Sequence, residues 1–541
     1  MAYTSNYQVR NIPSLSGGLN TASEATEIAD NEMADCENFA VDESSMITAP
    51  GIVPGDYVPA EGPYWGMFHF IKSNGDTVFI RQRKGKLEYN TSASTFYFLG
   101  WTECTLPQTG SPAENISLTQ MTPCFAALDD QVVFTNGTDE VMVSSDGITW
   151  TIPETYGSPA EYLPKARYVI NNGYNRLVFA STDDDPSIIY WSDINDPTTI
   201  STSSYQYIDP NNGEAIIGIG KTPSGSLVCF KVKSFYTIDD VSLGSVAVNY
   251  IGFFKLANHH TIQTTEDSII AAGVDGVYEL QGGVMRIISG RILMGGRNLT
   301  LHSEVFRSGY YKREYHFSMP TSDSSDYNAQ EYVIHKDLRR DDAVQPYVIT
   351  RNQRYIGAYH HVTEEDTVLG KPGGLFVGDS RSAVGSPAAG GTMFGWINSY
   401  RQTSYTQGIM GEAQPAYFTT KYFTEDKAFF AKRFTKLFTQ LKILNDTSVT
   451  LSYRFLPYGA WTDHQQTVEA GELDFLLEDS SEGGFSEGYS FFLQDTSDLK
   501  QDLESSTNEP GGIQFKVSTN QINDVYVLGM AYKFLIRNKF K

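Results

Sequence analysis

A unit of strand, tight turn and strand recurs along the middle of this chain and constrains its fold more than any other feature. The units begin at Val132, Leu177, Leu227, Ile269 and Tyr315, so successive starts lie 45, 50, 42 and 46 residues apart by subtraction. Each unit alternates β-branched and aromatic residues around a turn of Gly, Asn or Asp, which is typical of antiparallel strands. A period of roughly 40 to 50 residues fits one four-stranded blade of a β-propeller. The sequence therefore predicts an all-β fold built on a large propeller.

Two further segments extend the series of blades. Residues 66–90 contain an earlier hairpin of the same kind, and GGLFVGDSR at 373–381 resembles a later one. Together with the five units above, they give six or seven candidate blades. We therefore expect the propeller, with loop insertions, to occupy residues 61–391.

The chain of 541 residues exceeds the roughly 250 to 300 that one hydrophobic core serves, so further domains are expected. Residues 1–60 are predicted to form an extended arm with one short helix, because Met33, Cys36 and Phe39 follow helical spacing at i, i+3 and i+6. After a loop rich in Gly, Ser and Ala, residues 392–541 contain long alternating strands. These predict a linker followed by a C-terminal β-sandwich-like domain.

The charge balance argues against a protein that grips nucleic acid through its phosphates. The chain has 64 acidic against 40 basic residues and a formal charge of −24, whereas such proteins present clustered Lys and Arg. An acidic wall can still serve DNA by repelling it, so that the duplex slides past. No run of 18 apolar residues is present, so no membrane-spanning segment is expected. The four cysteines lack metal-binding spacing and are interpreted as free, buried thiols.

Residue patterns for catalysis, cofactors or metals are scarce. The oxygen-rich segments at 183–186 and 209–214 could hold Ca²⁺, but neither has EF-hand spacing, and both are interpreted as turns. The pairs His259/His260 and His360/His361 are expected on strands, where neighbours point to opposite faces and do not share a metal. We expect no catalytic site, no cofactor and no metal.

The segment SSDGITW comes within one residue of the Asp box, S-x-D-x-G-x-x-W, of sialidase-like propellers. Its matching residues are Ser144, Asp146, Gly147 and Trp150. In that motif the Asp side chain bonds the backbone of the turn, and the Trp packs beneath it. A sialidase would also need converging arginines, and the spacing of the candidates indicates no convergence. These are Arg167, Arg176, Arg286, Arg291 and Arg313.

The amino-terminal arm resembles the opening of virion proteins from short-tailed bacteriophages. The pattern is a GGLN step, an acidic D-N-E segment, an Asn step and a closing Pro-Gly. The matching residues are Gly17, Gly18, Leu19, Asn20, Asp30, Asn31, Glu32, Asn38, Pro50 and Gly51. Phrases of the blades at 189–198, 227–238 and 273–283 resemble the same proteins. One departure is Ala49, where the family's usual Arg precedes Pro-Gly, which puts a basic contact there in doubt.

The resemblance implies a propeller-type tail nozzle, or tail tube, protein. Such a protein would form a hexameric ring below the portal and adaptor, with tail fibres or spikes at its side. It would retain and then conduct double-stranded DNA without sequence-specific binding. It would be assembled in the host cytoplasm and reside in the virion tail. The alternative is a tail propeller that binds the host surface or acts on carbohydrate in the manner of a sialidase.

Overall fold

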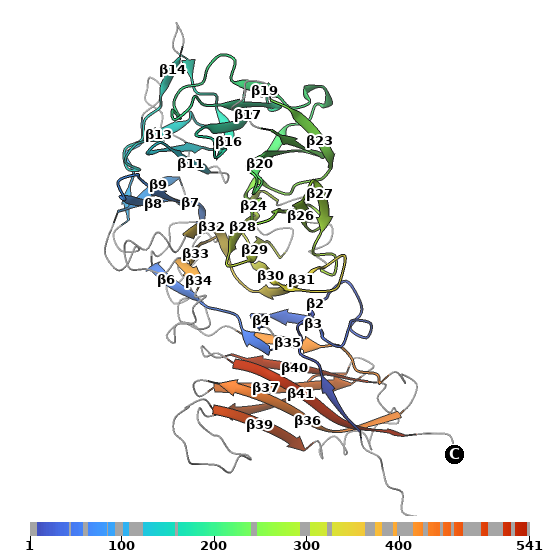
Figure 1. Cartoon of the computed structure of the whole chain (residues 1–541). Helices are drawn as coiled ribbons and strands as arrows, with labels where there is room; N and C mark the ends of the chain where they lie inside the picture. Colours follow the sequence, from blue (N-terminus) through green and yellow to red (C-terminus); the bar gives the residue numbers. More distant parts are fainter. Residues whose placement is uncertain are drawn as a thin grey trace, which may run out of the picture.

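A computed structural model of the chain shows its fold. The structure describes residues 8–42, 45–57, 63–83, 85–91, 101–107, 123–156, 161–239, 246–292, 303–321, 327–362, 374–380, 393–397, 415–425, 431–443, 447–455, 459–468, 488–495, 512–520 and 525–537. Within them the chain forms two lobes, a ring of small sheets and a pair of larger sheets beneath it (Figure 1). We name these the propeller lobe and the sandwich lobe.

Seven sheets of the described residues form the propeller lobe, which agrees with the higher of the two expected blade counts. Six have four strands and the second has three. The first three blades are β7 (Tyr64–Ile71), β8 (Thr77–Arg83), β9 (Lys86–Asn90) and β10 (Thr102–Glu103); β11 (Cys124–Leu128), β12 (Gln131–Thr135) and β13 (Met142–Ser144); β16 (Ala166–Asn171), β17 (Leu177–Thr182), β18 (Ile188–Trp191) and β19 (Tyr205–Tyr207). A separate hairpin, β14 (Glu154–Tyr156) and β15 (Glu161–Tyr162), follows the second blade.

The remaining four blades continue the ring. They are β20 (Ile216–Lys221), β21 (Leu227–Lys231), β22 (Ser234–Ile238) and β23 (Val248–Phe253); β24 (Gln263–Thr264), β25 (Ile269–Ala272), β26 (Val277–Gln281) and β27 (Val284–Ile287); β28 (Arg307–Tyr311), β29 (Glu314–Met319), β30 (Gln330–Arg339) and β31 (Tyr347–Asn352); β32 (Ile356–Val362), β33 (Gly374–Asp379), β34 (Met393–Ile397) and β6 (Ile52–Tyr57). β32 of the seventh blade contacts β7 of the first, which closes the ring.

The recurrent sequence unit corresponds to the second and third strands of a blade. The hairpins β12–β13, β17–β18, β21–β22, β25–β26 and β29–β30 begin at or next to the residues from which the repeat was counted. These two strands are sandwiched between neighbouring blades, so their side chains are buried on both faces. Phe179 and Phe230, one in each of two such hairpins, are completely inaccessible to solvent. The repeat is conspicuous because these strands carry most of the apolar residues of a blade.

The seventh blade is completed by a strand from the other end of the chain. β6 pairs antiparallel with β34, so that Val53 lies opposite Trp396 and Ile52 opposite Ile397. β34 lies beyond residue 391, the expected end of the propeller, because the Gly- and Ser-rich segment precedes the last strand of the ring. Most of that segment, 381–392, lies outside the described residues. The pairing of β6 with β34, which are distant in the sequence, thus completes the last blade of the ring.

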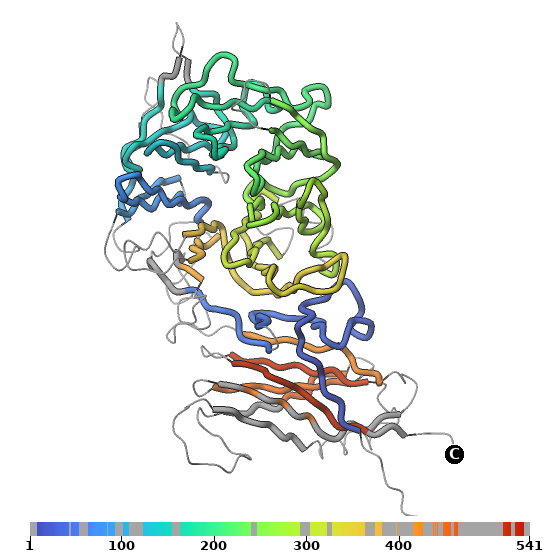
Figure 2. Tube along the Cα trace, in the orientation of Figure 1, coloured from blue at the N-terminus to red at the C-terminus, as the bar shows by residue number. Residues whose placement is uncertain are grey.

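The sandwich lobe combines both ends of the chain in two six-stranded sheets (Figure 2). The first sheet contains β1 (Gln8–Ile12), β4 (Phe39–Asp42), β5 (Ser45–Thr48), β36 (Ala431–Ile443), β39 (Gly488–Asp495) and β41 (Val525–Arg537). The second contains β2 (Gly18–Leu19), β3 (Glu32–Glu37), β35 (Ala416–Thr420), β37 (Thr447–Phe455), β38 (Thr462–Val468) and β40 (Ile513–Thr519). The arm is therefore extended, as expected; its strands β1 to β5 belong to the sheets of this lobe, whereas β6 belongs to the seventh blade.

The prediction of a short helix in the arm is wrong, because these residues form strands β3 and β4. A β-bulge between Met33 and Asp35 shifts the pleat, so Met33 and Cys36 both point into the core although they are three residues apart. Asn38 then adopts φ 56° between the two strands, and Phe39 is buried as well. The bulge and the left-handed conformation of Asn38 together bury Met33, Cys36 and Phe39 at intervals of three residues, which is the spacing that suggested a helix.

Two expectations about the whole chain can be compared with the described residues. All four cysteines are free and buried, which confirms their interpretation as thiols of the core. No helix in the described part of the chain has the length and apolar character needed to cross a membrane.

Candidate functional site

Most of the ten residues of the arm pattern gather where the two lobes meet. β2, β3 and β4 of the arm contact β31, the last strand of the sixth blade (Figure 1). One hydrophobic cluster runs through this contact, with Leu19 and Phe39 from the arm and Tyr347 and Ile349 from the blade. We call this region, with its flanking residues 340–354, the joint.

Both glycines of the GGLN step lie in close contact with backbone, Gly17 with another part of the arm and Gly18 with the sixth blade. A Cβ on Gly17 would lie 2.7 Å from the Asn31 carbonyl oxygen, to which the Gly17 N–H donates at 2.9 Å. Gly18 has φ +73°, and a Cβ there would lie 2.9 Å from the Ile349 carbonyl oxygen. Leu19 is fully buried, and its carbonyl accepts a hydrogen bond from the Gln345 amide at 3.2 Å. The step therefore permits backbone contact between lobes.

Glu32 is the charged centre of the joint. Its buried carboxylate accepts hydrogen bonds from the Asn20 side chain at 2.8 Å and the Ala29 N–H at 2.9 Å, and it forms an ion pair with Arg340 of the sixth blade. Burial acts to raise the pKa of Glu32, but these three donors outweigh it and the net pKa is lowered. The carboxylate is thus held ionised between the arm and the blade.

Asn38 connects three segments that are distant in sequence. Its N–H donates to the Arg351 carbonyl at 2.9 Å, and its side-chain oxygen accepts from the Gln353 N–H at 2.9 Å. Its amide group donates to the Pro415 carbonyl at 2.8 Å. Asparagine tolerates the left-handed conformation found here better than most residues do. Both its backbone and its side chain are therefore required by the geometry.

The other pattern residues secure the arm at its two ends. Asp30 pairs with Arg10 and accepts from Lys421 at 2.9 Å, both within the sandwich lobe. The Pro50 carbonyl accepts from Arg354, next to buried Gly51. Ala49, which departs from the family pattern, is buried and donates its N–H to the Asn38 carbonyl at 2.8 Å. A guanidinium does lie beside the Pro-Gly step, and it comes from Arg354.

The near match to an Asp box forms a compact turn in the second blade. The Asp146 carboxylate accepts from the N–H groups of Ile148 at 2.8 Å and Thr149 at 2.7 Å, and from the Ser144 hydroxyl at 2.8 Å. Gly147 has φ +74°, and Trp150 is buried with its ring edge toward Phe134. All of these contacts are internal to the blade, so the motif acts as a structural turn.

The oxygen-rich segments form turns, as expected. In the second, a lysine occupies the position that a cation would take: Lys231 donates to the carbonyls of Ile208 at 2.7 Å and Asp209 at 2.9 Å, and to Asn212 at 2.8 Å. Asp185 of the first segment accepts from the N–H and hydroxyl of Ser187, both at 2.7 Å. Among the described residues, no group of three or more His, Cys, Asp or Glu is placed to hold a metal ion.

The arginines considered for a sialidase do not meet in one site. Arg176 donates to the Ser192 carbonyl in the third blade, and Arg286 pairs with Glu279 in the fifth. Arg291 pairs with Asp342 close to the joint, and Arg313 occupies a turn of the sixth blade with φ 62°. Arg167 of the third blade is exposed, with its Cζ 5.7 Å from the centre of the Tyr168 ring, and its charge contributes, after burial, to the lowered pKa values of His259 and His260.

The first strands of all seven blades surround a cavity on the propeller axis, of about 320 Å³. We call it the axial cavity. Its lining includes Phe68, Lys221, His259, His260, Arg307 and His360. It was not found from sequence, because each first strand lies outside the repeated hairpin. The sequence signal for the axial cavity is the stretch of about one strand before each repeated hairpin. These stretches form the first strands of the blades, and their inward-facing side chains line the cavity.

The expectation for the two histidine pairs is half correct. His360 lines the axial cavity while His361 packs on Tyr311, so this pair points to opposite faces of β32. His259 and His260 instead lie on a 3-10 helix, His259–Thr261, and both line the cavity with ring centres 5.3 Å apart. Burial and the charges of Arg167 and Arg307 lower the pKa of His259 to about 3. Burial and the charge of Arg307 also lower the pKa of His260, so both rings of this pair are neutral at pH 7.

Comparison with known proteins gives no family. No family profile matches the chain, and no curated protein resembles it in sequence. Among solved structures, the extracellular domain of a protein named as a one component system of B. thetaiotaomicron matches 90% of this chain at 12% identity, with a TM-score of 0.39. The chain spans 62% of the length of that domain. The Pan2 WD40 domain of Neurospora crassa matches 65% of this chain and 97% of its own at 10% identity, with a TM-score of 0.38. Likenesses at this level carry no functional argument, and the propeller is established by the order of its strands.

Proposed function

We propose that this chain is a noncatalytic structural subunit of a bacteriophage tail nozzle. Copies of it would form a ring, with six as the expected number, below the portal and adaptor, and the ring would retain and then conduct the genome. The observation that carries the proposal is the joint. Residues of the arm pattern, which are spread between Gly17 and Gly51 in sequence, share one structural task at the contact between lobes.

The joint suits a subunit that must hold a fixed shape. It combines a continuous apolar core with the buried Glu32–Arg340 pair and with Arg351, which donates to Asp35 at 2.7 Å. Contacts in a closed ring repeat the same rotation from copy to copy, so a variable angle between lobes would prevent closure. A rigid connection between propeller and sandwich is therefore an advantage to an assembly protein.

In this proposal the DNA path runs between subunits. The axial cavity holds about 320 Å³ and is lined by aromatic and histidine rings. Duplex DNA has a major groove that alone is about 12 Å wide, so a duplex needs a much broader passage than the axis of one propeller. A ring of copies leaves such a passage at its centre. The net charge of −24 per chain would let the polyanion pass without phosphate contacts that hold it.

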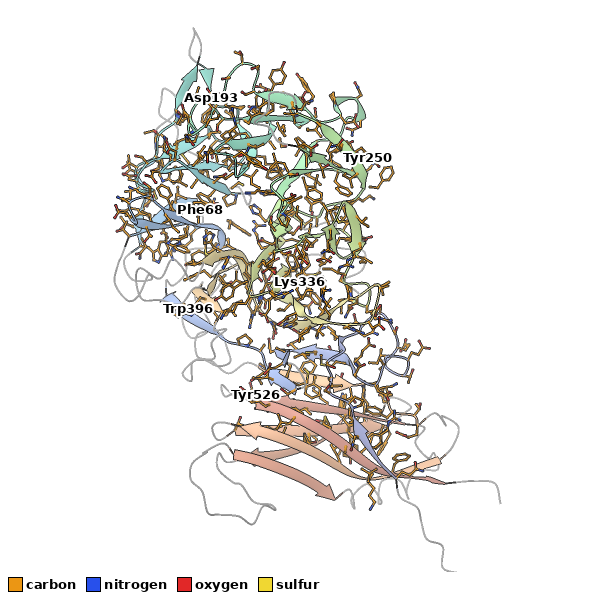
Figure 3. The ribbon with its side chains drawn as sticks, viewed as in Figure 1. Phe68, Asp193, Tyr250, Lys336, Trp396 and Tyr526 are labelled. Carbon is orange, nitrogen blue, oxygen red and sulfur yellow. The ribbon has the colours of Figure 1, made fainter. Side chains whose placement is uncertain are left out.

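Exposed aromatic side chains on the outer strands of the third and fourth blades are candidates for the contact between copies. On β23, Phe253 is 85% and Tyr250 51% exposed, and their rings pack edge to face at 6.0 Å. Tyr205 and Tyr207 on β19 are also exposed. Figure 3 places Tyr250 on the outer side of the propeller. Aromatic residues are enriched at protein interfaces, where they bury large areas.

Assembly of the purified protein tests the proposal. Native mass measurement and negative-stain imaging should give sixfold rings with an axial hole. Phe253→Ser should weaken or abolish the rings, whereas Val284→Ser, at a side chain 66% exposed on the outer strand of the fifth blade, should leave them intact. Rings formed equally well by both variants would remove β23 from the contact. A monomer that cleaves a sialoside would contradict the nozzle and favour the carbohydrate-active alternative.

A further inference from the structure

The backbone at Asp209, directly before Pro210, is strained. These residues lie in the turn that leads from β19 of the third blade to β20 of the fourth, and Asp209 has φ 44° and ψ 67°. Aspartate adopts this left-handed conformation more readily than most residues do, but a following proline restricts the residue before it to extended conformations. Strain of this kind persists where surrounding contacts hold it, and it is typical of functional sites.

Two other Asp-Pro bonds of the chain serve as internal references. They join residues 185–186 and 196–197, both between strands of the third blade. Neither aspartate is among the described residues with positive φ. Each uses its Oδ1 atom to accept from the residue after the proline, Ser187 at 2.7 Å and Thr198 at 2.6 Å, through the hydroxyl groups. The strain is therefore specific to Asp209.

Two donors converge on the carbonyl oxygen of Asp209, which belongs to the bond with proline. The Lys231 ammonium donates to it at 2.9 Å, and the Asn212 N–H donates at 3.4 Å. Lys231 is fully buried, and its ammonium is fixed by two further acceptors, the Ile208 carbonyl at 2.7 Å and the Asn212 side-chain oxygen at 2.8 Å. A cation and an N–H on one carbonyl oxygen form an oxyanion hole, which stabilises negative charge when a nucleophile adds to the carbon.

The Asp209 carboxylate supplies a nucleophile beside this carbonyl. Its Oδ2 atom accepts from the Tyr236 hydroxyl at 2.7 Å and from the Asn212 amide at 3.1 Å. Its Oδ1 atom has no hydrogen-bond partner in the part of the chain that the structure describes. Attack by Oδ1 on the carbonyl carbon of the same residue closes a small ring, so the reacting atoms are held together by covalent bonds.

We propose that the chain cleaves its own Asp209–Pro210 bond. Oδ1 of Asp209 bonds to the carbonyl carbon, and the resulting oxyanion is held by Lys231 and the Asn212 N–H. The oxyanion then reforms the carbonyl, the C–N bond breaks, and Lys231 gives a proton to the proline nitrogen. Asp209 is left as a cyclic anhydride. Water opens it to two carboxylates, and the two protons released go to Lys231 and to the new proline amine.

The surroundings of the bond suit each of these steps. Burial lowers the pKa of Lys231, although the charges of Asp209 and Glu214 act to raise it, and a lowered pKa makes the ammonium a better proton donor. Asp209 is exposed, so water reaches the anhydride. The reaction occurs once in each chain and needs a single subunit, so it does not depend on the nozzle proposal.

The two products should remain associated after cleavage. They are residues 1–209 and 210–541, and the new ends lie between the third and fourth blades. One hydrophobic cluster joins these blades, with Val178 and Ile189 from the third and Ile219 and Leu227 from the fourth. Cleavage is therefore visible only when the protein is denatured.

Incubation of the purified full chain at pH 7 tests the proposal. Denaturing gels and mass measurement should reveal the two products, with masses that sum to the chain plus one water, and sequencing of the larger should begin at Pro210. Native mass measurement should show them together. The bonds at 185–186 and 196–197 should stay intact, and in urea the difference between the three bonds should vanish. An intact chain, or equal cleavage at the three bonds before denaturation, would overturn the proposal.

Variants separate self-cleavage from a contaminating protease. Asp209→Asn keeps a residue that tolerates the left-handed conformation but removes the carboxylate, so this chain should stay intact. Lys231→Met removes one oxyanion donor and should slow cleavage about 100-fold. Lys233→Gln changes an exposed lysine in the turn after Lys231 and should be cleaved at the wild-type rate.

Circular dichroism checks that each variant keeps its strands, and the comparison of the three bonds in the wild type stands without the variants. Cleavage of Asp209→Asn at the wild-type rate would assign the reaction to a protease and overturn the proposal. Equal rates in Lys231→Met and Lys233→Gln would also overturn it, because the oxyanion hole would then have no effect.

Discussion

Replacing Glu32 by Gln should loosen the joint selectively. The amide keeps the shape of the side chain but removes the charge, and its NH2 group faces donors where an acceptor is needed. Removing one member of a buried ion pair costs about 3 to 5 kcal/mol. In the variant Arg340 retains a weaker contact with Asp342 at 3.8 Å. The expected loss of stability is therefore at the lower end of this range, about 3 kcal/mol.

The effect should appear as faster local opening of the joint, since a chain with two lobes need not unfold in one step. The amides of Gly17, Asn20 and Asn38 donate backbone hydrogen bonds there. A loss of about 3 kcal/mol corresponds to roughly 100-fold faster hydrogen exchange in mass spectrometry, while the blade amides around Phe179 should be unaffected.

The pH dependence of this difference follows from the lowered pKa of Glu32. A carboxyl whose pKa falls on folding contributes stability above its unfolded value, 4.5, and that contribution is lost as the pH drops through the folded pKa. Gln does not titrate, so the difference in stability of the joint between wild type and variant should become smaller below pH 4.5. As a control, Glu103→Gln removes an exposed pair with Lys86 and should change stability by less than about 0.5 kcal/mol. If joint amides of Glu32→Gln exchange as slowly as those of Glu103→Gln, Glu32 does not hold the lobes together.

Three other perturbations should have measurable effects. Asp146→Ala removes the acceptor of three hydrogen bonds in the turn of the second blade. It should destabilise that blade by about 2 kcal/mol, measured as faster hydrogen exchange of its amides. Unchanged exchange would mean that water replaces the carboxylate. Gly18→Ala should lower the melting temperature more than Gly75→Ala does, because both positions have positive φ but only at Gly18 would the new methyl lie 2.9 Å from a carbonyl oxygen. Although burial opposes it, Glu331 and Glu314 raise the pKa of His316 to about 9, so its stabilising charge is complete below pH 6.5 and is lost as the pH rises through 9. His316→Gln should therefore lack the decline in thermal stability that wild type undergoes between pH 6.5 and 9, and identical pH profiles would contradict this.

Local signals in the sequence predicted the parts of the fold that local interactions determine. The hairpin from Leu227 is recognisable because two buried strands are joined by a short turn, and the turn at Asp146 because its hydrogen bonds span only a few residues. The class of fold follows from repeating such hairpins. The helix expected at Met33 failed because a bulge depends on the partner strand β35, which follows hundreds of residues later.

Long-range placement was the part that sequence could not give. The arm pattern was recognised, but nothing in it indicates that Glu32 meets Arg340 or that Asn38 meets Arg351. The cavity residues Lys221 and Arg307 come from different blades, and only closure of the ring brings them together. Neighbouring positions 259 and 260 also required the 3-10 turn, which a strand pattern does not anticipate.

Because β1 pairs with β41, the sheet that contains both strands can be completed only late in synthesis of the chain. Ile12 pairs with Met530, which is translated 518 residues later by subtraction, and β6 pairs with β34. At roughly 5 to 20 residues per second, about 25 to 100 s pass before β1 meets β41. During that time the first strands have unpaired edges that can join those of other nascent chains. Slower initiation of translation or a holding chaperone should therefore raise the yield of folded protein.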